Sequence, residues 1–182
     1  MDDVTAPPTG LGETRHLAQH PDRVRDLPPV VVAVDGSDAS VRALVWAFRH
    51  AVVHGLPVVA LTTWPLSGDV FVRARPGHFC EPRWQAREVQ AEAVSRALAA
   101  VTHPPTYDLR VDNAELVDAL IRAGERASMV VIGSDGPADS TPTRRRTADR
   151  LRHEVEVPVV VVGPDGPLAG TVPEPGRHSG SR

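Results

Sequence analysis

Four short runs of branched apolar residues constrain the fold of this chain more than any other feature of its sequence. The runs are residues 29–34 (PVVVAV), 57–61 (PVVAL), 129–132 (MVVI) and 158–162 (PVVVV). Apolar residues are continuous along each run and do not alternate with polar ones, so both faces of each strand must be covered. Strands of a parallel sheet that lies between two layers of helices meet this condition. The runs therefore predict buried parallel strands.

The first two gaps between the runs have helical patterns. One apolar stripe at helical spacing consists of Val41, Leu44, Val45, Phe48 and Val52. Either Ser37 or Asp38 is placed to cap this helix. A second helix is predicted over residues 81–101, with inward side chains at Val94, Ala97, Leu98 and Val101.

Two further helices and a weaker strand complete the pattern. A third helix is predicted over residues 113–127, and Asn113 is its candidate cap. Its apolar face consists of Leu116, Val117, Leu120 and Ile121. The fourth helix follows an arginine run and ends before Pro158, with an apolar face at Ala148, Leu151 and Val155. Residues 107–111 alternate between polar and apolar types, which predicts an edge strand.

Strands and helices thus alternate along the chain, which predicts an α/β fold. With right-handed crossovers, five strands and four helices form an open, doubly wound parallel sheet with helices on both faces. Ligands of such sheets bind beyond the carboxyl ends of the strands, where the connections of two neighbouring strands diverge. This geometry brings Asp35, which follows the first strand, and Gly133, which follows the fourth, to one crevice.

Length and composition predict one globular domain with two tails. The chain has 182 residues, of which 41% are hydrophobic and 24% are charged, enough for a single core. Residues 1–27 and 164–182 lack apolar periodicity and are rich in polar residues and proline, so they are predicted as disordered tails around a domain at residues 28–163. The formal net charge of −3 supplies no field that would recruit nucleic acid or a membrane.

Residue types also restrict the chemistry and the location of the protein. The chain contains no lysine, which excludes Walker-type phosphate loops, Schiff-base enzymes and response-regulator receivers as usually built. Cys80 is the single cysteine, so no intrachain disulfide can form. The N-terminal residues lack the pattern of an export signal, and no apolar run approaches the roughly 20 residues that span a bilayer. We therefore expect a cytoplasmic protein.

Four segments together resemble a universal stress protein domain over about residues 29–163. They are VVVAVDGSDAS, VVALTTW, VVIGSDG and TADRLRHEVEVPVVVV. The resemblance implies a Rossmann-like sheet of five parallel strands in the order 3-2-1-4-5. It also implies that the chain either binds ATP, as many members do, or binds no nucleotide, as others do. Members commonly dimerise through the last strand, and no inward charge interrupts residues 158–162, so a homodimer through this edge strand is expected.

The loop after the fourth strand is where this resemblance is incomplete. Nucleotide-binding members carry a loop of the form GxxGx9G followed by Ser or Thr. Gly133 and Gly136 match the first two glycines, Arg146 stands at the third, and Thr147 supplies the hydroxyl. A Cβ at Arg146 obstructs close approach of backbone N–H groups to phosphate, whereas the arginines at 144–146 offer charge-assisted bonds to it. A solvated first helical turn without any ligand is the alternative interpretation of the arginine run.

The adenosine end of such a ligand is also implied by the resemblance. Asp35 would approach the adenosine, and the backbone near Thr63 would line the adenine. From the residues alone, Asp35 in the DGSD segment equally well caps the turn that follows it. No partnered base or nucleophile accompanies Asp35, so no catalytic residue is assigned.

Histidines provide the one pattern that suggests a protein-held metal. His50 and His54 have the spacing of a helical metal pair, but no third ligand is evident, and solvated histidines are the expected interpretation. No metal is predicted except Mg²⁺ that accompanies a nucleotide.

The sequence therefore predicts a stress-response binding and signalling module that holds ATP or another adenine nucleotide through a degenerate loop. The site would comprise Asp35, Thr63, Gly133, Gly136, Arg146 and Thr147. A nucleotide-free dimeric scaffold for protein partners is the first alternative. A slow nucleotide hydrolase, with Asp135 or Asp139 supporting Mg²⁺, is the second and less favoured one.

Overall fold

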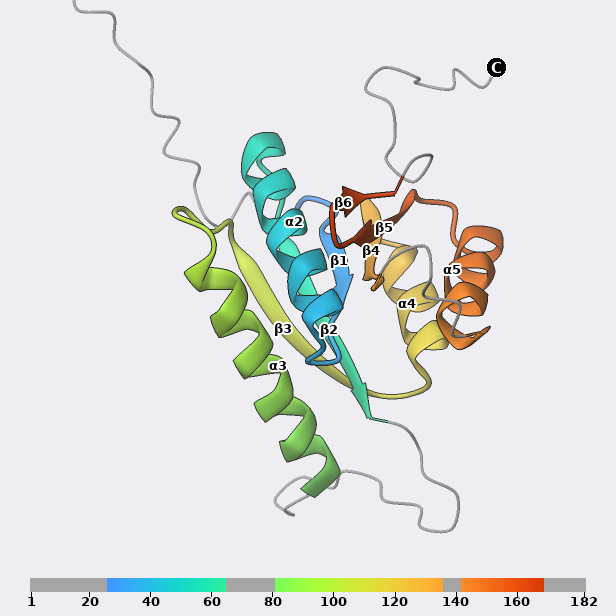
Figure 1. Cartoon of the computed structure of the whole chain (residues 1–182). Coiled ribbons are helices and arrows are strands. Elements are labelled where there is room, and N and C mark those ends of the chain that lie inside the picture. The colour runs from blue at the N-terminus through green and yellow to red at the C-terminus, as the bar shows by residue number, and fades with distance from the viewer. Residues whose placement is uncertain (1–25, 65–80, 136–141, 169–182) are drawn as a thin grey trace, which may run out of the picture.

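The computed structural model describes residues 26–64, 81–135 and 142–168, without the side chains of residues 142–146. Within these ranges one open sheet lies between two layers of helices (Figure 1). The strands are β1 (Val30–Ala33), β2 (Val58–Trp64), β3 (Tyr107–Asn113), β4 (Met129–Gly133), β5 (Val159–Gly163) and β6 (Gly166–Pro167). Their order is β3-β2-β1-β4-β5-β6, and the first five are parallel. The predicted parallel sheet of order 3-2-1-4-5 is confirmed.

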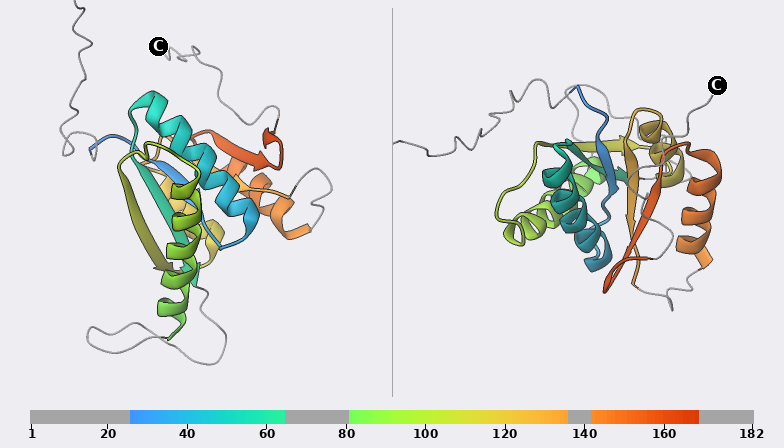
Figure 2. Two further views of the ribbon diagram at one scale, coloured as in Figure 1. Left: turned by 60° about the vertical axis from the view of Figure 1, so that its left-hand side comes forward. Right: turned by 90° about the horizontal axis from the view of Figure 1, so that it is seen from above.

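Helices cover both faces of the sheet, as a doubly wound fold requires. They are α2 (Asp38–His54), α3 (Glu81–Ala99), α4 (Leu116–Gly124) and α5 (Pro142–Glu154). The views in Figure 2 show α2 and α3 on one face and α4 and α5 on the other. None of the described helices combines the length and the apolar character that a transmembrane segment needs.

Two hydrophobic cores explain why the apolar runs are continuous. Along β1, Val30 and Val32 face the core under α2 and α3, whereas Val31 faces the core under α4 and α5. The same division holds along β4, where Val131 lies in the first core and Val130 in the second. Because each strand buries both of its faces, no position in the run is left for a polar residue.

The buried face of α2 differs in part from its predicted stripe. Leu44 and Phe48 are fully buried as expected, but Val52 is 47% exposed. Alanines 43, 47 and 51 are fully buried and centre the face that meets the sheet. Val52 lies at the border of the face that these alanines centre, so it is partly exposed.

The predicted start of the third helix is wrong. Strand β3 continues through Asn113, which pairs with Trp64 of β2, and α4 begins only at Leu116. The side-chain amide of Asn113 donates a hydrogen bond to the carbonyl oxygen of Trp64 at 3.3 Å, so it is not available as a cap. Glu115 is the N-cap residue, and its side chain makes no capping bond.

Strand β5 is not the edge of the sheet that residues 158–162 were expected to form. A turn at residues 164–165 returns the chain as β6, which pairs antiparallel with Val162 and Gly163. The N–H of Leu168 donates a further hydrogen bond to the carbonyl oxygen of Val161 at 2.8 Å. The four valines of β5 are at most 7% exposed, so this chain buries them itself. Gly166 and Pro167, assigned to the C-terminal tail from the sequence, thus form a strand of the sheet.

Strands β1 and β4 are neighbours, paired from Val30 with Met129 to Val32 with Val131. After β1 the chain leads into α2 on one face, and after β4 it leads towards α5 on the other. Their carboxyl ends therefore form the switch point at which ligands of open parallel sheets bind.

Candidate functional site

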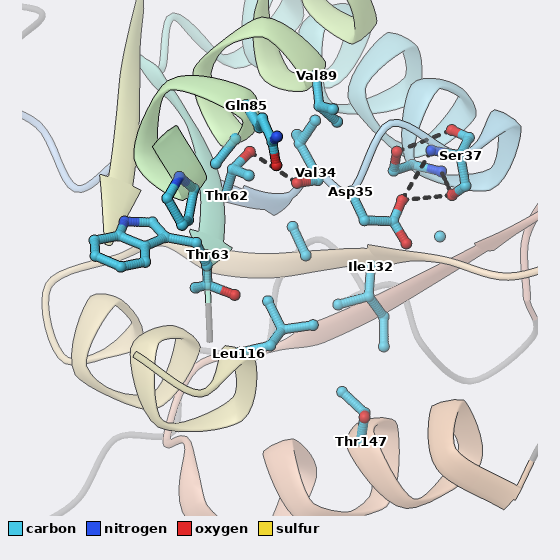
Figure 3. Close-up of a pocket in the computed structure, with 16 residues that line it drawn as sticks. Val34, Asp35, Ser37, Thr62, Thr63, Gln85, Val89, Leu116, Ile132 and Thr147 are labelled. Atoms are coloured by element: carbon cyan, nitrogen blue, oxygen red, sulfur yellow. Dashed lines mark hydrogen bonds between the residues drawn. The ribbon is translucent and has the colours of Figure 1, made fainter. Parts of the chain in front are cut away.

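A cavity of about 370 Å³ opens at this switch point (Figure 3). Gln85 and Val89 of α3 line one side, and Leu116 of α4 and Thr147 of α5 line the opposite side. The carboxyl ends of β1, β2 and β4 form the wall of the cavity between these two sides. The volume falls in the range of small-molecule sites, roughly 300–1,000 Å³, and the walls are mainly apolar with a few polar groups, as such sites usually are.

The turn after β1 places Asp35 at this cavity. Its Oδ1 accepts hydrogen bonds from the backbone N–H of Ser37 at 3.0 Å and from the Ser37 hydroxyl. Gly36 between them has a φ of +84°, a conformation that side chains disfavour, and a Cβ there would lie 2.6 Å from Cγ1 of Val89. Asp35 therefore organises the turn, as its position before a glycine predicts, and it also lines the cavity.

Ser37 caps α2, which confirms one of the two predicted caps. Its hydroxyl oxygen accepts the N–H of Ser40 at 3.2 Å. Asp38, the other candidate, is the first residue of α2 and pairs instead with Arg96 of α3. The hydrogen bond and the charge of Arg96 lower the pKa of the Asp38 carboxyl. This ion pair joins the start of α2 to α3 beside the cavity.

A buried amide that the sequence analysis missed fixes the β2 side of the cavity. Gln90 of α3 is 2% exposed, and its Nε2 donates to the carbonyl oxygens of Ala60 and Arg110, each at 2.9 Å, and to Oγ1 of Thr62 at 3.1 Å. The Thr62 hydroxyl in turn donates to the carbonyl oxygen of Val34 at 2.8 Å. One side chain thus joins α3 to β2 and β3, and Thr62 extends the network to the end of β1. In the sequence, Gln90 stands at helical spacing from Ala86, Ala93 and Ala97, and this spacing could have placed it on the buried face of α3.

Gly133 is needed for packing against α2. A Cβ at this position would lie 2.2 Å from the carbonyl oxygen of Ala39 and 2.8 Å from the backbone nitrogen of Ser40. Among the glycines of the described ranges, positive φ occurs at Gly36, Gly55 and Gly166 and not at Gly133. The absent side chain therefore allows the first turn of α2 to lie directly on the end of β4.

Four of the six predicted site residues line this one cavity: Asp35, Thr63, Gly133 and Thr147. Arg146 lies in the helical backbone of α5, and its side chain is outside the described residues. Gly136 also lies outside them. Among the lining residues that the structure describes, Asp35 alone carries a formal charge.

The histidine pair lies apart from the cavity, on α2. The rings of Trp46 and His50 are stacked with centroids 5.0 Å apart, and the His54 ring lies 4.2 Å from that of His50. Burial, and to a lesser extent the charge of His54, lower the pKa of His50. Over the described part of the chain, no three or more His, Cys, Asp or Glu side chains gather as a metal site would require.

Comparison with known proteins identifies the family of this chain. The sequence model of the Universal stress protein family matches residues 28–163, so the chain belongs to the universal stress protein family. Universal stress protein Rv2028c of Mycobacterium tuberculosis is 28% identical over 142 residues, which cover 75% of this chain and 48% of that protein. A universal stress protein of Mycolicibacterium smegmatis is 29% identical over 141 residues, covering 75% of this chain and 46% of the relative. The chain thus spans about half the length of these relatives.

Solved structures of the family share the architecture. The universal stress protein from Archaeoglobus fulgidus in complex with dAMP has a TM-score of 0.53 and 27% identity, covering 75% of this chain and 98% of that one. A universal stress protein in complex with cAMP has a TM-score of 0.56 and 20% identity, covering 76% of this chain and 98% of that one. The second likeness concerns the fold alone.

Proposed function

We propose that this chain is a stress-response binding module that holds an adenine nucleotide, with ATP as the first candidate, in the cavity at the ends of β1, β2 and β4. The observation that carries the proposal is the convergence of Asp35, Thr63, Gly133 and Thr147, from four separate elements, on one cavity of about 370 Å³. The dAMP complex of the Archaeoglobus fulgidus relative supports the adenine class of ligand.

The distribution of polar groups suggests how the nucleotide is oriented. Val34, Val89 and Ile132 offer apolar walls to a flat base. The Asp35 carboxylate accepts hydrogen bonds from ribose hydroxyls and repels phosphate, because both are negative. The phosphates are then directed to the far side of the cavity, where the Thr147 hydroxyl can donate to them. The loop motif of the sequence assigns Gly136 and Arg146 to phosphate as well.

Any Mg²⁺ would enter as the counterion of the bound phosphates. Carboxylates that hold Mg²⁺ usually do so together with substrate phosphates. We therefore propose no resident metal and no catalytic residue in this site.

Calorimetric titration of the purified chain with ATP and with AMP, in the presence of Mg²⁺, tests the proposal, with GTP as the control for base recognition. Product analysis of the same samples separates the alternatives. Binding without hydrolysis is the expected result. Hydrolysis would instead favour the enzyme, and the absence of binding to any adenine compound would favour the nucleotide-free scaffold.

Two further proposals concern the state of the protein. A cytoplasmic location is supported by the single cysteine, Cys80, which fits a reducing compartment. A homodimer through residues 158–162 would have to pair where β6 does not, because β6 occupies the outer side of β5 at Val162 and Gly163. Sedimentation equilibrium of the full chain distinguishes such a dimer from a monomer.

A further inference from the structure

Strand β3 is the outermost strand of the sheet, at the end opposite to β5 and β6 (Figure 1). It pairs with β2 over seven residues, Tyr107–Asn113, and no other described strand pairs with its outer side. At the other end of the sheet, β6 already covers part of the outer side of β5. The long open edge of the described sheet is therefore β3.

The pairing with β2 shows which backbone groups of β3 point outward. The N–H of Val58 in β2 donates to the carbonyl oxygen of Thr106 at 2.9 Å, and the parallel register aligns Val58 with Tyr107. Every second residue of a strand turns both its N–H and its C=O to the same side, so Thr106 and every second residue after it face β2. Tyr107, Leu109 and Val111 therefore present their backbone groups at the outer edge.

An exposed leucine lies at the middle of this edge. Leu109 is on the same face of the strand as Tyr107, which packs against the core under α2 and α3. Tyr107 is partly buried there, whereas Leu109 is 50% exposed. Helix α3 thus leaves the apolar side chain at the centre of β3 open to a further neighbour.

The opposite face of β3 carries charges of alternating sign. Arg110 pairs with Asp112 at 2.9 Å, and these side chains are 48% and 19% exposed. Asp108 is exposed and forms no ion pair with any described residue. Charges on an edge strand commonly prevent pairing with other molecules, because like charges directly opposite each other are unfavourable. Which strand can pair with β3 is therefore decided by the charges that would meet.

A second copy of β3 matches this edge in one antiparallel register. With Leu109 opposite Leu109 of the second copy, Tyr107 lies opposite Val111, and each of these pairs can exchange both backbone hydrogen bonds. Asp108 then lies opposite Arg110 of the second copy, and the two-fold axis repeats this pair of opposite charges. Backbone groups, the exposed leucine and the charges are all satisfied together.

Two other registers keep the same backbone groups facing each other but match the side chains less well. With Arg110 opposite itself, each aspartate also lies opposite an aspartate, so like charges meet at every charged position. With Val111 opposite itself, the exposed Leu109 lies opposite the polar Asn113, and Asp108 has no charged group across from it. The side chains therefore select the register that is centred on Leu109.

We infer that the outer edge of β3 is the docking surface for a second copy of this chain, which pairs antiparallel about Leu109 and extends the sheet across a two-fold axis. In strand addition of this kind the main-chain bonds supply affinity and the side chains supply specificity. The inference does not depend on nucleotide binding. It differs from a homodimer through residues 158–162 in the edge that joins the two copies.

Two charge reversals test the register, separately and mixed. Asp108→Arg and Arg110→Asp each set like charges opposite each other in a dimer of identical copies. In a mixed dimer of the two variants, every reversed residue meets an opposite charge again. Sedimentation equilibrium of the full chain over a concentration series should show each variant associating at least about tenfold more weakly than the parent. The equimolar mixture should associate within about threefold of the parent.

Leu109→Ser tests the centre of the interface, and the chain offers a matched control. Val53 on α2 is 79% exposed, so Val53→Ser replaces another exposed apolar side chain by a hydroxyl. Leu109→Ser should weaken association at least about fivefold, whereas Val53→Ser should match the parent. Circular dichroism of each variant shows that the fold is retained, which matters most for Arg110→Asp because this change also removes the pair with Asp112.

Three results would overturn the inference. The first is a parent chain that stays monomeric at every concentration. The second is a dimer whose affinity neither reversal changes, because that dimer would use another surface, such as the edge at β5. The third is a mixture that remains as weak as the separate variants, because Asp108 and Arg110 of two copies would then not meet.

Discussion

Gly133 and Ala39 are in direct backbone contact: a Cβ built on Gly133 would lie 2.2 Å from the carbonyl oxygen of Ala39. This contact joins the end of β4 to the first turn of α2. Both lie at the switch point of the sheet. The atoms that a side chain would meet belong to the backbone of a capped helix, so they cannot move aside as the end of a flexible side chain can. The glycine at this position therefore serves the packing of α2 on the sheet.

Gly133→Ala should consequently destabilise the protein strongly. Overpacking of a well-packed site costs about 1–3 kcal/mol, and we expect a loss near or above the upper value because helix and strand must separate. Urea denaturation monitored by circular dichroism measures the change in the free energy of unfolding. Gly163→Ala is the control, since a Cβ there would meet the flexible Leu168 side chain at 3.1 Å. Equal losses for the two variants would contradict this interpretation of the contact.

Gln90 provides a second test, of the network that joins α3 to the strands. Gln90→Leu keeps the approximate volume of the side chain but removes the donor to the Ala60 and Arg110 carbonyl oxygens and to Thr62. Buried acceptors that lose a partner cost about 1–3 kcal/mol, which is the expected loss of stability.

The matched control for this change is Gln85→Leu on the same helix. Gln85 is exposed and donates a hydrogen bond to the exposed Glu81 carboxylate at 3.2 Å, so its replacement should change the free energy of unfolding by less than about 0.5 kcal/mol. If both variants unfold at the same urea concentration as the parent, the Gln90 network does not stabilise the fold.

Local sequence patterns predict some features of this fold and miss others. Continuous apolar runs predict four of the five parallel strands because each of these strands has to bury both faces, and the edge strand β3 was predicted from its alternation. Both signals are local. The strand β6 was missed because Gly166 and Pro167 have no apolar pattern, and their pairing with β5 depends on the preceding turn. The convergence of Asp35 and Gly133 follows from topology alone. The role of Gln90 depends on distances between elements, which no spacing along the chain encodes.

The pH dependence of stability should reflect His50. Burial and the neighbouring His54 lower the pKa of His50 below its ordinary value of 6.5, so the unfolded chain binds a proton more readily than the folded one. This contribution to stability is present above pH 6.5 and is lost as the pH falls through the lowered pKa of the folded state. Thermal unfolding should therefore occur at a lower temperature near about pH 5.5 than near about pH 7.5.

Two comparisons separate the contribution of His50 from that of other titrating groups. Asp38, whose pKa is lowered from 3.8 by Arg96, changes stability only in a more acidic window, below its ordinary pKa. His50→Gln removes the titrating group, so the difference in melting temperature between the two pH values should shrink in this variant. An undiminished difference would assign the effect to another group.

Thr147 tests the orientation proposed for the nucleotide. It lines the side of the cavity opposite Val89, and its hydroxyl is the group proposed to donate to phosphate. Thr147→Val keeps the shape and removes the hydroxyl, and a lost hydrogen bond to a charged group corresponds to a roughly 10- to 100-fold weaker affinity for ATP. Thr147→Ser retains the hydroxyl and should bind ATP nearly as the parent does. Calorimetric titration of both variants with ATP and with adenosine measures this. Because adenosine has no phosphate, an equal loss of adenosine affinity in Thr147→Val would place Thr147 at the base or ribose and reverse the proposed orientation.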